Sequence, residues 1–193
     1  MPPSESAATD RVLDAAEHLF MERGYAGTRL RDIAAVLGIK HTSLYHHAPG
    51  GKQELWDRVL ERALCRHRDR IEAIAQEAPT LASQLKAVAT WLESQPAMNV
   101  VAMATPNQPT AAQPQAEAIT GLLYAYLLRP VAALFQAARE RGEISKDAPD
   151  LLAGMFVASI NAVIPAHAAG ELPRSFEEVA DDIIAVLIQG AND

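Results

Sequence analysis

Apolar residues recur at helical spacing through most of the chain, and no alternating β-branched runs appear. The first segment with this pattern covers residues 9–23, where the apolar positions are Val12, Leu13, Ala16, Leu19 and Phe20. They fall at i, i+1, i+4, i+7 and i+8, which places one apolar stripe along a helix. Residues 1–8 show no such period, so we expect a frayed tail there, followed by a helix that ends at Gly24.

A shorter helix is predicted directly after Thr28, whose hydroxyl is suited to cap its first turn. Asp32 would lie in that turn, where the helix dipole favours a negative charge. Gly38 suits the position after the last turn, because glycine adopts positive φ cheaply. One face of the helix is apolar, through Leu30, Ile33, Ala34 and Leu37.

A third helix is expected over residues 41–47, with Leu44 as its one clear core anchor. A helix so short and polar is marginal alone and must be held by its neighbours. Two helices joined by the tight connection Gly38-Ile39-Lys40 indicate a helix-turn-helix, in which the second helix enters the major groove of DNA.

The run AAEHLFMERGYAGTRLRDIAAVLGI, followed by SLYHHAPGGKQEL, resembles the TetR family of bacterial transcriptional regulators. The resemblance covers about residues 9–60, and the PGGK ending is similar to one subgroup of that family. Ala48 departs from the family pattern, because phenylalanine is usual there. Lys40-His41-Thr42 departs as well, since Ser-Lys-Gly is common, so the operator of better-known members is not carried over.

The resemblance implies an all-α fold, with a three-helix DNA-binding domain followed by a helical ligand-binding and dimerisation domain. Length and composition agree, since 193 residues suit one small domain and one larger core. The boundaries that we expect are a tail over residues 1–8, the helix-turn-helix over 9–52 and the second domain over 53–193.

The candidate DNA contacts differ in what each would touch. Residues at the start of the recognition helix would reach base edges, whereas the helix N-terminus at Thr28 and Arg29 would attract a phosphate. The resemblance implies that Tyr45, His47 and Lys52 hold the phosphate backbone. Packing or plain surface is the alternative role for Tyr45 and His46. The full candidate set is Thr28, Arg29, Lys40, His41, Thr42, Ser43, Tyr45, His46, His47 and Lys52.

The formal net charge of −7 disfavours an anionic partner for the chain as a whole. Over residues 23–52, however, five Lys and Arg stand against Asp32 alone, a local excess of four positive charges. Most of the acidic excess follows residue 70, so a cationic patch on an acidic body can still bind phosphates in a salt-dependent way.

The single cysteine, Cys65, cannot form an internal disulfide, which fits a reducing cytoplasm. No stretch approaches the ~18 uninterrupted apolar residues of a membrane span, and no secretory signal is visible. We therefore expect a cytoplasmic protein without a membrane partner. The histidines point in different directions and no paired carboxylates lie near, so neither a metal nor another cofactor is expected.

Further helices are predicted over residues 52–78, 80–94 and 115–141, the last with Pro130 inside it as a kink. The last two helices carry apolar stripes wider than one monomer core needs, which favours a four-helix bundle between two subunits. Such a homodimer would match a palindromic operator on double-stranded DNA. The candidate interface comprises Leu152, Met155, Phe156, Ser159, Ile160, Val163, Phe176, Val179, Ile183, Ile184 and Leu187.

A small-molecule effector would be sensed between the middle helices, in a largely apolar cavity with a few polar groups. Its candidate lining is Trp91, Met98, Val101, Met103, Tyr124, Leu127 and Phe156. Residues of this type at helical spacing are also typical of packed core. The effector would act by favouring a conformation with wrongly spaced recognition helices, and so release DNA.

Two other functions remain open. A helical-bundle enzyme or a ligand-binding protein without specific DNA binding would need convergent polar groups, and no Ser-His-Asp order, carboxylate pair or P-loop is evident, so no catalytic residue is expected. A DNA-packaging protein would be basic throughout, unlike this acidic chain. The sequence therefore favours a transcriptional regulator, with repression as the commoner mode of the family it resembles.

Overall fold

The computed structural model describes residues 5–95 and 120–192. Within these ranges every regular element is helical and no strand occurs, which confirms the all-α prediction. The chain forms two compact units, Met1–Ala63 and Leu64–Asp193. The division between them lies inside one helix, α4 (Gly51–Glu77).

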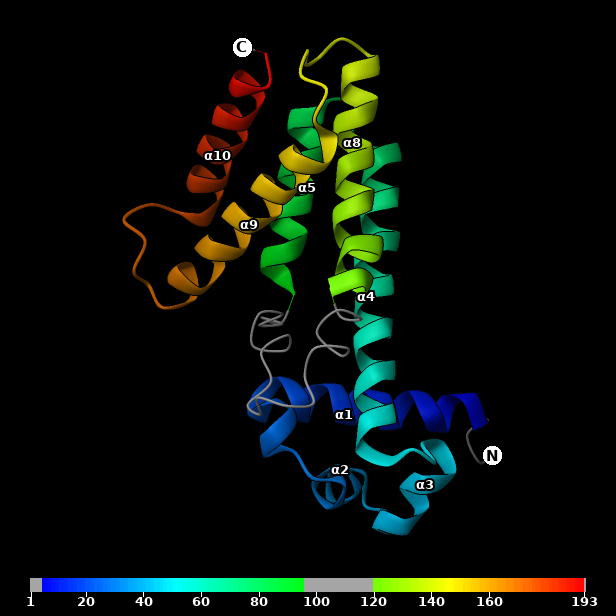
Figure 1. Cartoon of the computed structure of the whole chain (residues 1–193). Coiled ribbons are helices and arrows are strands. Elements are labelled where there is room, and N and C mark those ends of the chain that lie inside the picture. Colours follow the sequence, from blue (N-terminus) through cyan, green and yellow to red (C-terminus); the bar gives the residue numbers. More distant parts are fainter. Residues whose placement is uncertain (1–4, 96–119, 193) are drawn as a thin grey trace, which may run out of the picture. The chain divides into compact units, whose positions relative to one another are not determined.

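The N-terminal unit contains α1 (Glu5–Gly27), α2 (Leu30–Leu37), a 3₁₀ turn (His41–Ser43), α3 (Leu44–His47) and the first half of α4 (Figure 1). Because α3 is one turn long, its single buried residue, Leu44, anchors it to the unit. The other large buried side chains come from α1, α2 and α4, and include Leu19, Phe20, Ile33, Leu55 and Trp56.

The first helix differs from the prediction at both ends. It begins at Glu5, because the alanines at positions 7 and 8 favour a helix without needing an apolar period. At the other end Gly24 does break the helix, with φ 68° and ψ 172°, but a further turn runs to Gly27.

The turn between α2 and α3 has the predicted glycine geometry. Gly38 lies in the left-handed region (φ 67°, ψ 29°), and its N–H donates to Ala35 O. The N–H of Ile39 donates to Ala34 O, which completes a Schellman motif. This motif ends α2 and directs the chain into the recognition segment.

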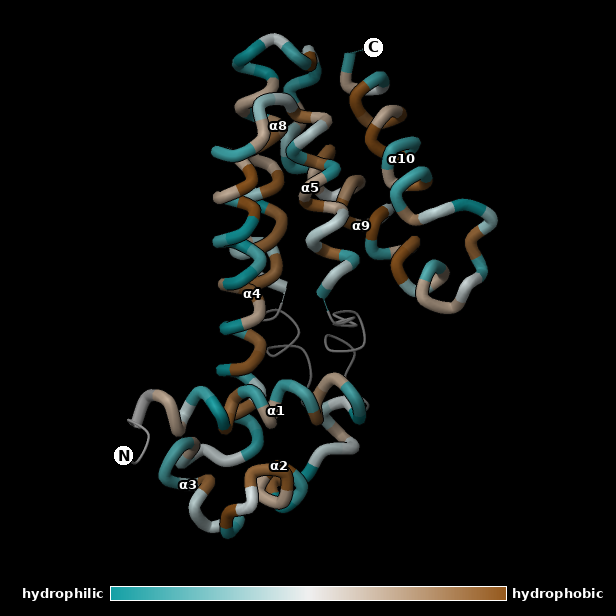
Figure 2. The backbone as a smooth tube through the Cα atoms, turned by 180° about the vertical axis from the view of Figure 1, so that it is seen from behind, coloured by the Kyte–Doolittle hydropathy of each residue, from teal (hydrophilic) through white to brown (hydrophobic). Residues whose placement is uncertain are grey.

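The C-terminal unit contains the rest of α4, α5 (Leu81–Ser94), α8 (Arg129–Glu140), α9 (Pro149–Ala168) and α10 (Phe176–Gly190). In Figure 2 the tube alternates between teal and brown along α4 and is largely brown along α9, as expected of an amphipathic helix and a mainly apolar one. Each helix contributes to one buried cluster, whose largest members include Ile71, Ile74, Leu85, Val131, Phe135, Phe156, Ile160 and Ile184.

Pro130 follows a π-helical segment that the sequence did not predict. Proline has no N–H to donate one turn back. The preceding residues Tyr124–Leu128 adopt a π-helix, in which the N–H of Arg129 donates to Tyr124 O. A π-bulge of this kind accommodates a missing backbone bond inside a continuous helix.

Two helical segments, Thr120–Glu140 and Pro149–Ala168, are long and apolar enough to cross a membrane by length and composition alone. Both supply core residues to the C-terminal unit, including Val131, Phe135, Phe156 and Ile160. About a third or less of each apolar window is buried, so packing within this unit accounts for only part of their apolar character.

Candidate nucleic-acid interface

The recognition segment presents polar side chains to solvent. Lys40, His41, Thr42 and His46 are exposed, and Ser43 is half-buried. Tyr45 is 47 % exposed, with its ring centroid 6.5 Å from that of His41. No acidic residue occurs between Asp32 and Glu54, so no carboxylate within this stretch competes with DNA for its donors.

Thr28 is wrongly predicted as both a helix cap and a phosphate contact. Its side chain is fully buried, and its hydroxyl lies 3.0 Å from Leu19 O and 2.9 Å from Gly24 O, to which it donates. The N-cap of α2 is Arg29 instead, whose N–H donates to the Asp32 carboxylate. Thr28 therefore stabilises the end of α1 and is not available to DNA.

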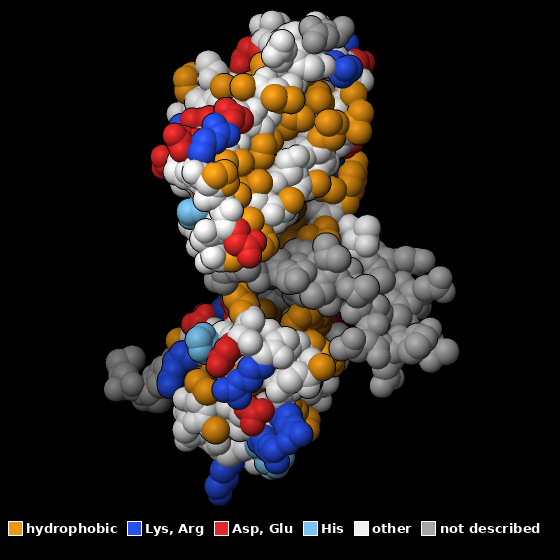
Figure 3. Space-filling model, turned by 90° about the vertical axis from the view of Figure 1, so that its left-hand side faces the viewer, with side chains coloured by type: hydrophobic (Ala, Val, Ile, Leu, Met, Phe, Trp, Pro, Cys, Tyr) orange, Lys and Arg blue, Asp and Glu red, His pale blue; other side chains and the backbone are white. Residues whose placement is uncertain are grey.

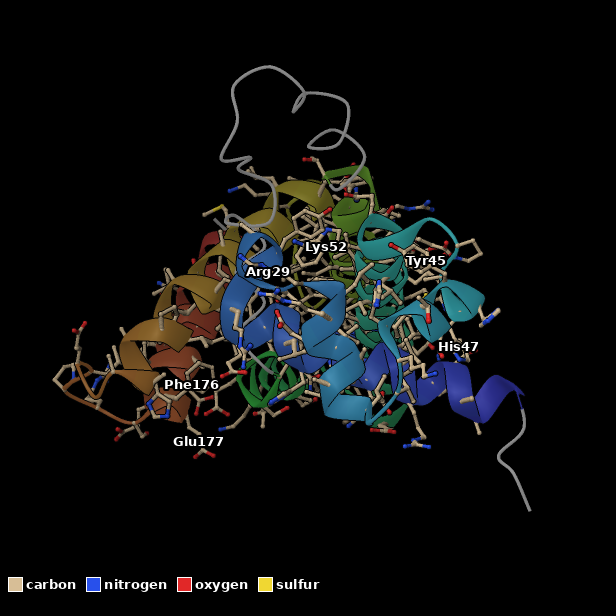
Figure 4. All side chains as sticks on the ribbon, turned by 90° about the horizontal axis from the view of Figure 1, so that it is seen from below. Arg29, Tyr45, His47, Lys52, Phe176 and Glu177 are labelled. Carbon is tan, nitrogen blue, oxygen red and sulfur yellow. The ribbon has the colours of Figure 1, made fainter. Side chains whose placement is uncertain are left out.

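Arg29 and Lys52 form a like-charged pair at the interface (Figure 4). Burial lowers the pKa of Lys52, and the nearby Arg29 guanidinium lowers it further. Among the described residues, neither cation is in an ion pair with a carboxylate. Two cations held together in this way favour an anion between them.

His47 is only partly available. Its Nδ1 lies 3.2 Å from the Thr9 hydroxyl of α1, and its carbonyl oxygen accepts from Arg58 Nη1 at 2.6 Å. Both bonds fix the end of α3, so a contact with phosphate would have to come from Nε2.

Sequence reasoning missed three residues that build this surface. Thr9 and Arg58 hold His47, as described above. Tyr25 supports Lys52, whose Nζ lies 4.1 Å from the centre of the Tyr25 ring. An aromatic residue directly after the helix-breaking Gly24 was the available signal for Tyr25. Arg58 was visible only as one member of a basic series along α4, which comprises Arg58, Arg62, Arg66 and Arg70.

Arg62, in the same basic series, faces α1 and not the solvent. Its Nη2 lies 2.8 Å from Asp14 Oδ1 and 2.5 Å from Glu17 Oε2. These pairs join α4 to α1 within the N-terminal unit.

The candidate effector residues are dispersed. Met98, Val101 and Met103 lie outside the described residues. Leu127 and Phe156 are buried in the main core cluster, and Tyr124 is exposed, donating its hydroxyl to Asp150. Half-buried Trp91 donates through Nε1 to Nδ1 of His67, 3.1 Å away. For Leu127 and Phe156 the packed-core alternative is the one that the structure shows.

The candidate dimer residues separate into two groups. Six are buried in the core of the unit itself and are not available to a partner: Leu152, Phe156, Ile160, Phe176, Ile184 and Leu187. The others are exposed or half-buried: Met155, Ser159, Val163, Val179 and Ile183. A wide apolar stripe could not be divided into these two faces from spacing alone.

An exposed apolar face nevertheless exists on α9 and α10 (Figure 3). It includes Leu151, Met155 and Val186, which are 60 %, 48 % and 70 % exposed. Ala158 and Ala162 continue the α9 stripe with small side chains. We call this set, with half-buried Val179 and Ile183, the α9–α10 face.

Within the described ranges, no group of three or more His, Cys, Asp or Glu side chains could hold a metal ion.

A short α2, a glycine turn and an exposed α3 anchored by one leucine define the N-terminal unit as a helix-turn-helix domain.

Comparison with known proteins identifies the type of this domain. Residues 12–59 match the family model described as bacterial regulatory proteins, tetR family. The N-terminal unit is therefore a helix-turn-helix domain of the TetR type.

Two curated relatives share this region. The HTH-type transcriptional regulator LmrA of Bacillus subtilis is 46% identical over 46 residues, covering 24% of each chain. The biofilm operon negative transcriptional regulator IcaR of Staphylococcus epidermidis is 42% identical over 52 residues, which is 27% of this chain and 28% of IcaR. The match thus spans about a quarter of the length of these relatives.

The likeness in fold extends over nearly the whole chain. The transcriptional regulator FadR from Bacillus subtilis, solved in complex with stearoyl-CoA, superposes with a TM-score of 0.74 at 16% identity. The superposition covers 94% of this chain and 98% of FadR. The C-terminal unit therefore shares its helical fold with the corresponding part of a regulator.

Proposed function

We propose that this protein is a DNA-binding transcriptional repressor that acts as a homodimer and is released by a small-molecule effector. The observation that carries the proposal is the exposed recognition segment, which is free of acidic residues and is presented by a helix-turn-helix of the TetR type. IcaR, similar over the same segment, is named as a negative regulator, which supports repression.

Within this function the exposed side chains divide into two roles. Lys40, His41 and Thr42 lie at the start of the recognition segment and select the base sequence; lysine suits guanine O6 and N7, and the threonine methyl suits thymine. Arg29, Tyr45 and Lys52 hold the phosphate backbone, with His47 contributing only through Nε2. Ser43 and His46 flank the contact.

The partner on the α9–α10 face is a second copy of this chain. The face is apolar, continuous and built on two adjacent helices, with alanines that allow close approach. Pairing two helices from each subunit buries it in a four-helix bundle. A two-fold dimer places two recognition helices for a palindromic operator.

The effector site belongs to the C-terminal unit, and a small apolar or aromatic molecule is the proposed ligand. Trp91 with its buried histidine partner supplies an apolar surface with one polar group. The stearoyl-CoA bound by FadR shows that this fold can hold an apolar chain. The effector shifts the population toward a conformation that fits the operator poorly.

The PGGK segment supports assignment to the subgroup that carries it. Gly51 has φ 72°, and a Cβ there would lie 3.7 Å from the Tyr45 ring. Gly50 N–H donates to Glu54 Oε2 at 2.7 Å and so caps α4.

A cytoplasmic location is proposed as well, because a protein that regulates transcription must reach the DNA.

Footprinting on the DNA that flanks the gene of this protein tests the function, with and without candidate effectors such as acyl-CoA esters. Protection of a two-fold symmetric sequence, lost on addition of an effector, is the expected result. Protection of no symmetric sequence would refute the regulator proposal.

A further inference from the structure

Tyr25 lies at the centre of an aromatic platform in the N-terminal unit. Its ring stacks on Phe20 with centroids 6.0 Å apart, and meets Trp56 edge-on at 5.2 Å. Both neighbours are buried, whereas Tyr25 itself is 36 % exposed. The platform therefore fixes one ring face at the surface.

The Lys52 ammonium occupies that face, 4.1 Å from the ring centre. A cation over an aromatic face is attracted by the ring quadrupole, so the four-carbon lysine side chain loses part of its freedom before any ligand arrives. The ring is oriented by its packing on Phe20 and Trp56. The Tyr25 hydroxyl also donates to Gln53 Oε1 at 2.9 Å, and Gln53 Nε2 donates to Asp57.

Lys52 keeps this position despite repulsion from the Arg29 guanidinium. Burial lowers the pKa of Lys52 most, and Arg29 lies close enough to lower it further. Tyr25 stays a neutral phenol at physiological pH, since burial and the nearby Asp57 raise its pKa above the ordinary value. An anion bound between the two cations would offset this repulsion, because an opposite charge nearby favours the charged form of each.

We propose that Tyr25 is a positioning residue for DNA binding: it holds the Lys52 ammonium beside Arg29, so that the two cations grip one backbone phosphate. The role rests on the proposed function. Tyr25 itself need not touch DNA, and it acts by reducing the side-chain entropy that Lys52 would otherwise lose on binding.

The test compares Tyr25→Leu, Tyr25→Phe, Lys52→Ala and the double variant Tyr25→Leu/Lys52→Ala by fluorescence anisotropy on a fluorescein-labelled duplex of randomised sequence. Leucine removes the ring face but can still pack on Phe20 and Trp56, whereas phenylalanine keeps the face. Tyr126→Leu is the matched control, since Arg68 lies over that ring at 5.3 Å in the C-terminal unit. Thermal melting confirms that each variant is folded.

Lys52→Ala is expected to weaken binding about tenfold or more, the effect of losing a charge-assisted bond. The slope of log affinity against log salt should fall by about 0.9 for each phosphate that the variant no longer neutralises. Tyr25→Leu should reproduce most of both effects, and the double variant should bind no more weakly than Lys52→Ala alone. Tyr25→Phe and Tyr126→Leu should bind like wild type.

The proposal is overturned if Tyr25→Leu binds like wild type while Lys52→Ala binds weakly, or if the two losses add in the double variant. A second readout needs no DNA: ring current should shift the Lys52 ε-CH₂ proton resonance upfield, and Tyr25→Leu should abolish that shift. If the wild-type protein shows the shift but binds no duplex, both the proposed function and the positioning role of Tyr25 are refuted. This outcome differs from the two above, which refute the positioning role alone.

Discussion

At the scale of single residues, burial decides which polar groups are available for function. Thr28 is the clearest example, because its hydroxyl donates to carbonyl oxygens of α1 inside the core. Thr28→Val keeps the shape and removes the donor, so we expect the free energy of unfolding to fall by about 1–3 kcal/mol. Urea denaturation measures the change.

Thr90→Val is the matched control, since that exposed hydroxyl also donates to a backbone carbonyl, Lys86 O. Its effect should stay within about 0.5 kcal/mol, as is usual at the surface. An equal effect at both positions would show that the buried bonds of Thr28 do not stabilise the fold.

His67 gives a prediction about pH. Burial, followed by the charge of Arg66, lowers its pKa to about 4, and its Nδ1 must stay unprotonated to accept from Trp91. Below about pH 6.5 His67 is protonated in the unfolded chain, whereas in the folded chain it stays neutral down to about pH 4. The free energy of unfolding should therefore fall by up to about 3 kcal/mol as the pH drops through this window.

His67→Gln tests this prediction, because glutamine can accept from Trp91 but does not titrate. Urea denaturation between pH 7 and pH 4 should show a shallower loss of stability in the variant. Identical pH profiles would exclude His67 as the cause.

The sequence predicted the exposed residues at the start of the recognition segment, since their types and order are local properties. It could not predict the contacts of His47 and Tyr25, because each depends on a side chain far along the chain. It missed those of Thr28 because the chain turns back at Gly24, which directs the hydroxyl to carbonyl oxygens of α1. The hydrogen bond between Thr9 and His47 spans 38 positions and leaves no periodic signal.

At the scale of elements, the helices with strong amphipathic periods were predicted closely. The helix predicted over residues 80–94 is α5 (Leu81–Ser94), with Thr80 as its cap. The helix predicted over 52–78 is α4 (Gly51–Glu77). The start of α1 and the π-helix before Pro130 were missed, because a hydrophobic period reports neither helix propensity nor backbone hydrogen bonding.

The turn before the recognition segment supplies an element-scale prediction. A Cβ at Gly38 would meet nothing within 4 Å, so the cost of Gly38→Ala is conformational, arising from φ 67°. We expect a loss of about 1 kcal/mol in the free energy of unfolding. Gly121→Ala is the control: its site is equally open but helical, so alanine should stabilise by up to about 1 kcal/mol.

Thermal melting distinguishes these two substitutions. A loss at both positions would point to steric crowding and would contradict the conformational argument for the turn.

At the scale of the whole molecule, the proposed function depends on a dimer formed through the α9–α10 face. Met155→Glu combined with Val186→Glu would bury four carboxylates in the proposed dimer without partners, which is strongly unfavourable. We expect a folded monomer in light scattering, with operator affinity reduced at least a hundredfold. Ala133→Glu, at an exposed position of α8, is the control and should remain dimeric.

A dimeric double variant would show that another surface joins the subunits. A monomeric variant that retained full operator affinity would instead separate dimerisation from DNA recognition.

The central claim is that residues 40–42 choose a DNA sequence while Tyr45 and Lys52 hold its backbone. Selection from a pool of random duplexes, carried out with wild type, Lys40→Ala and Lys52→Ala, tests it most directly. The wild-type protein should enrich one two-fold symmetric sequence. Lys52→Ala should enrich the same sequence but bind it more weakly, whereas Lys40→Ala should enrich sequences with a relaxed preference in each half-site. Enrichment of no symmetric sequence by the wild-type protein would contradict the account.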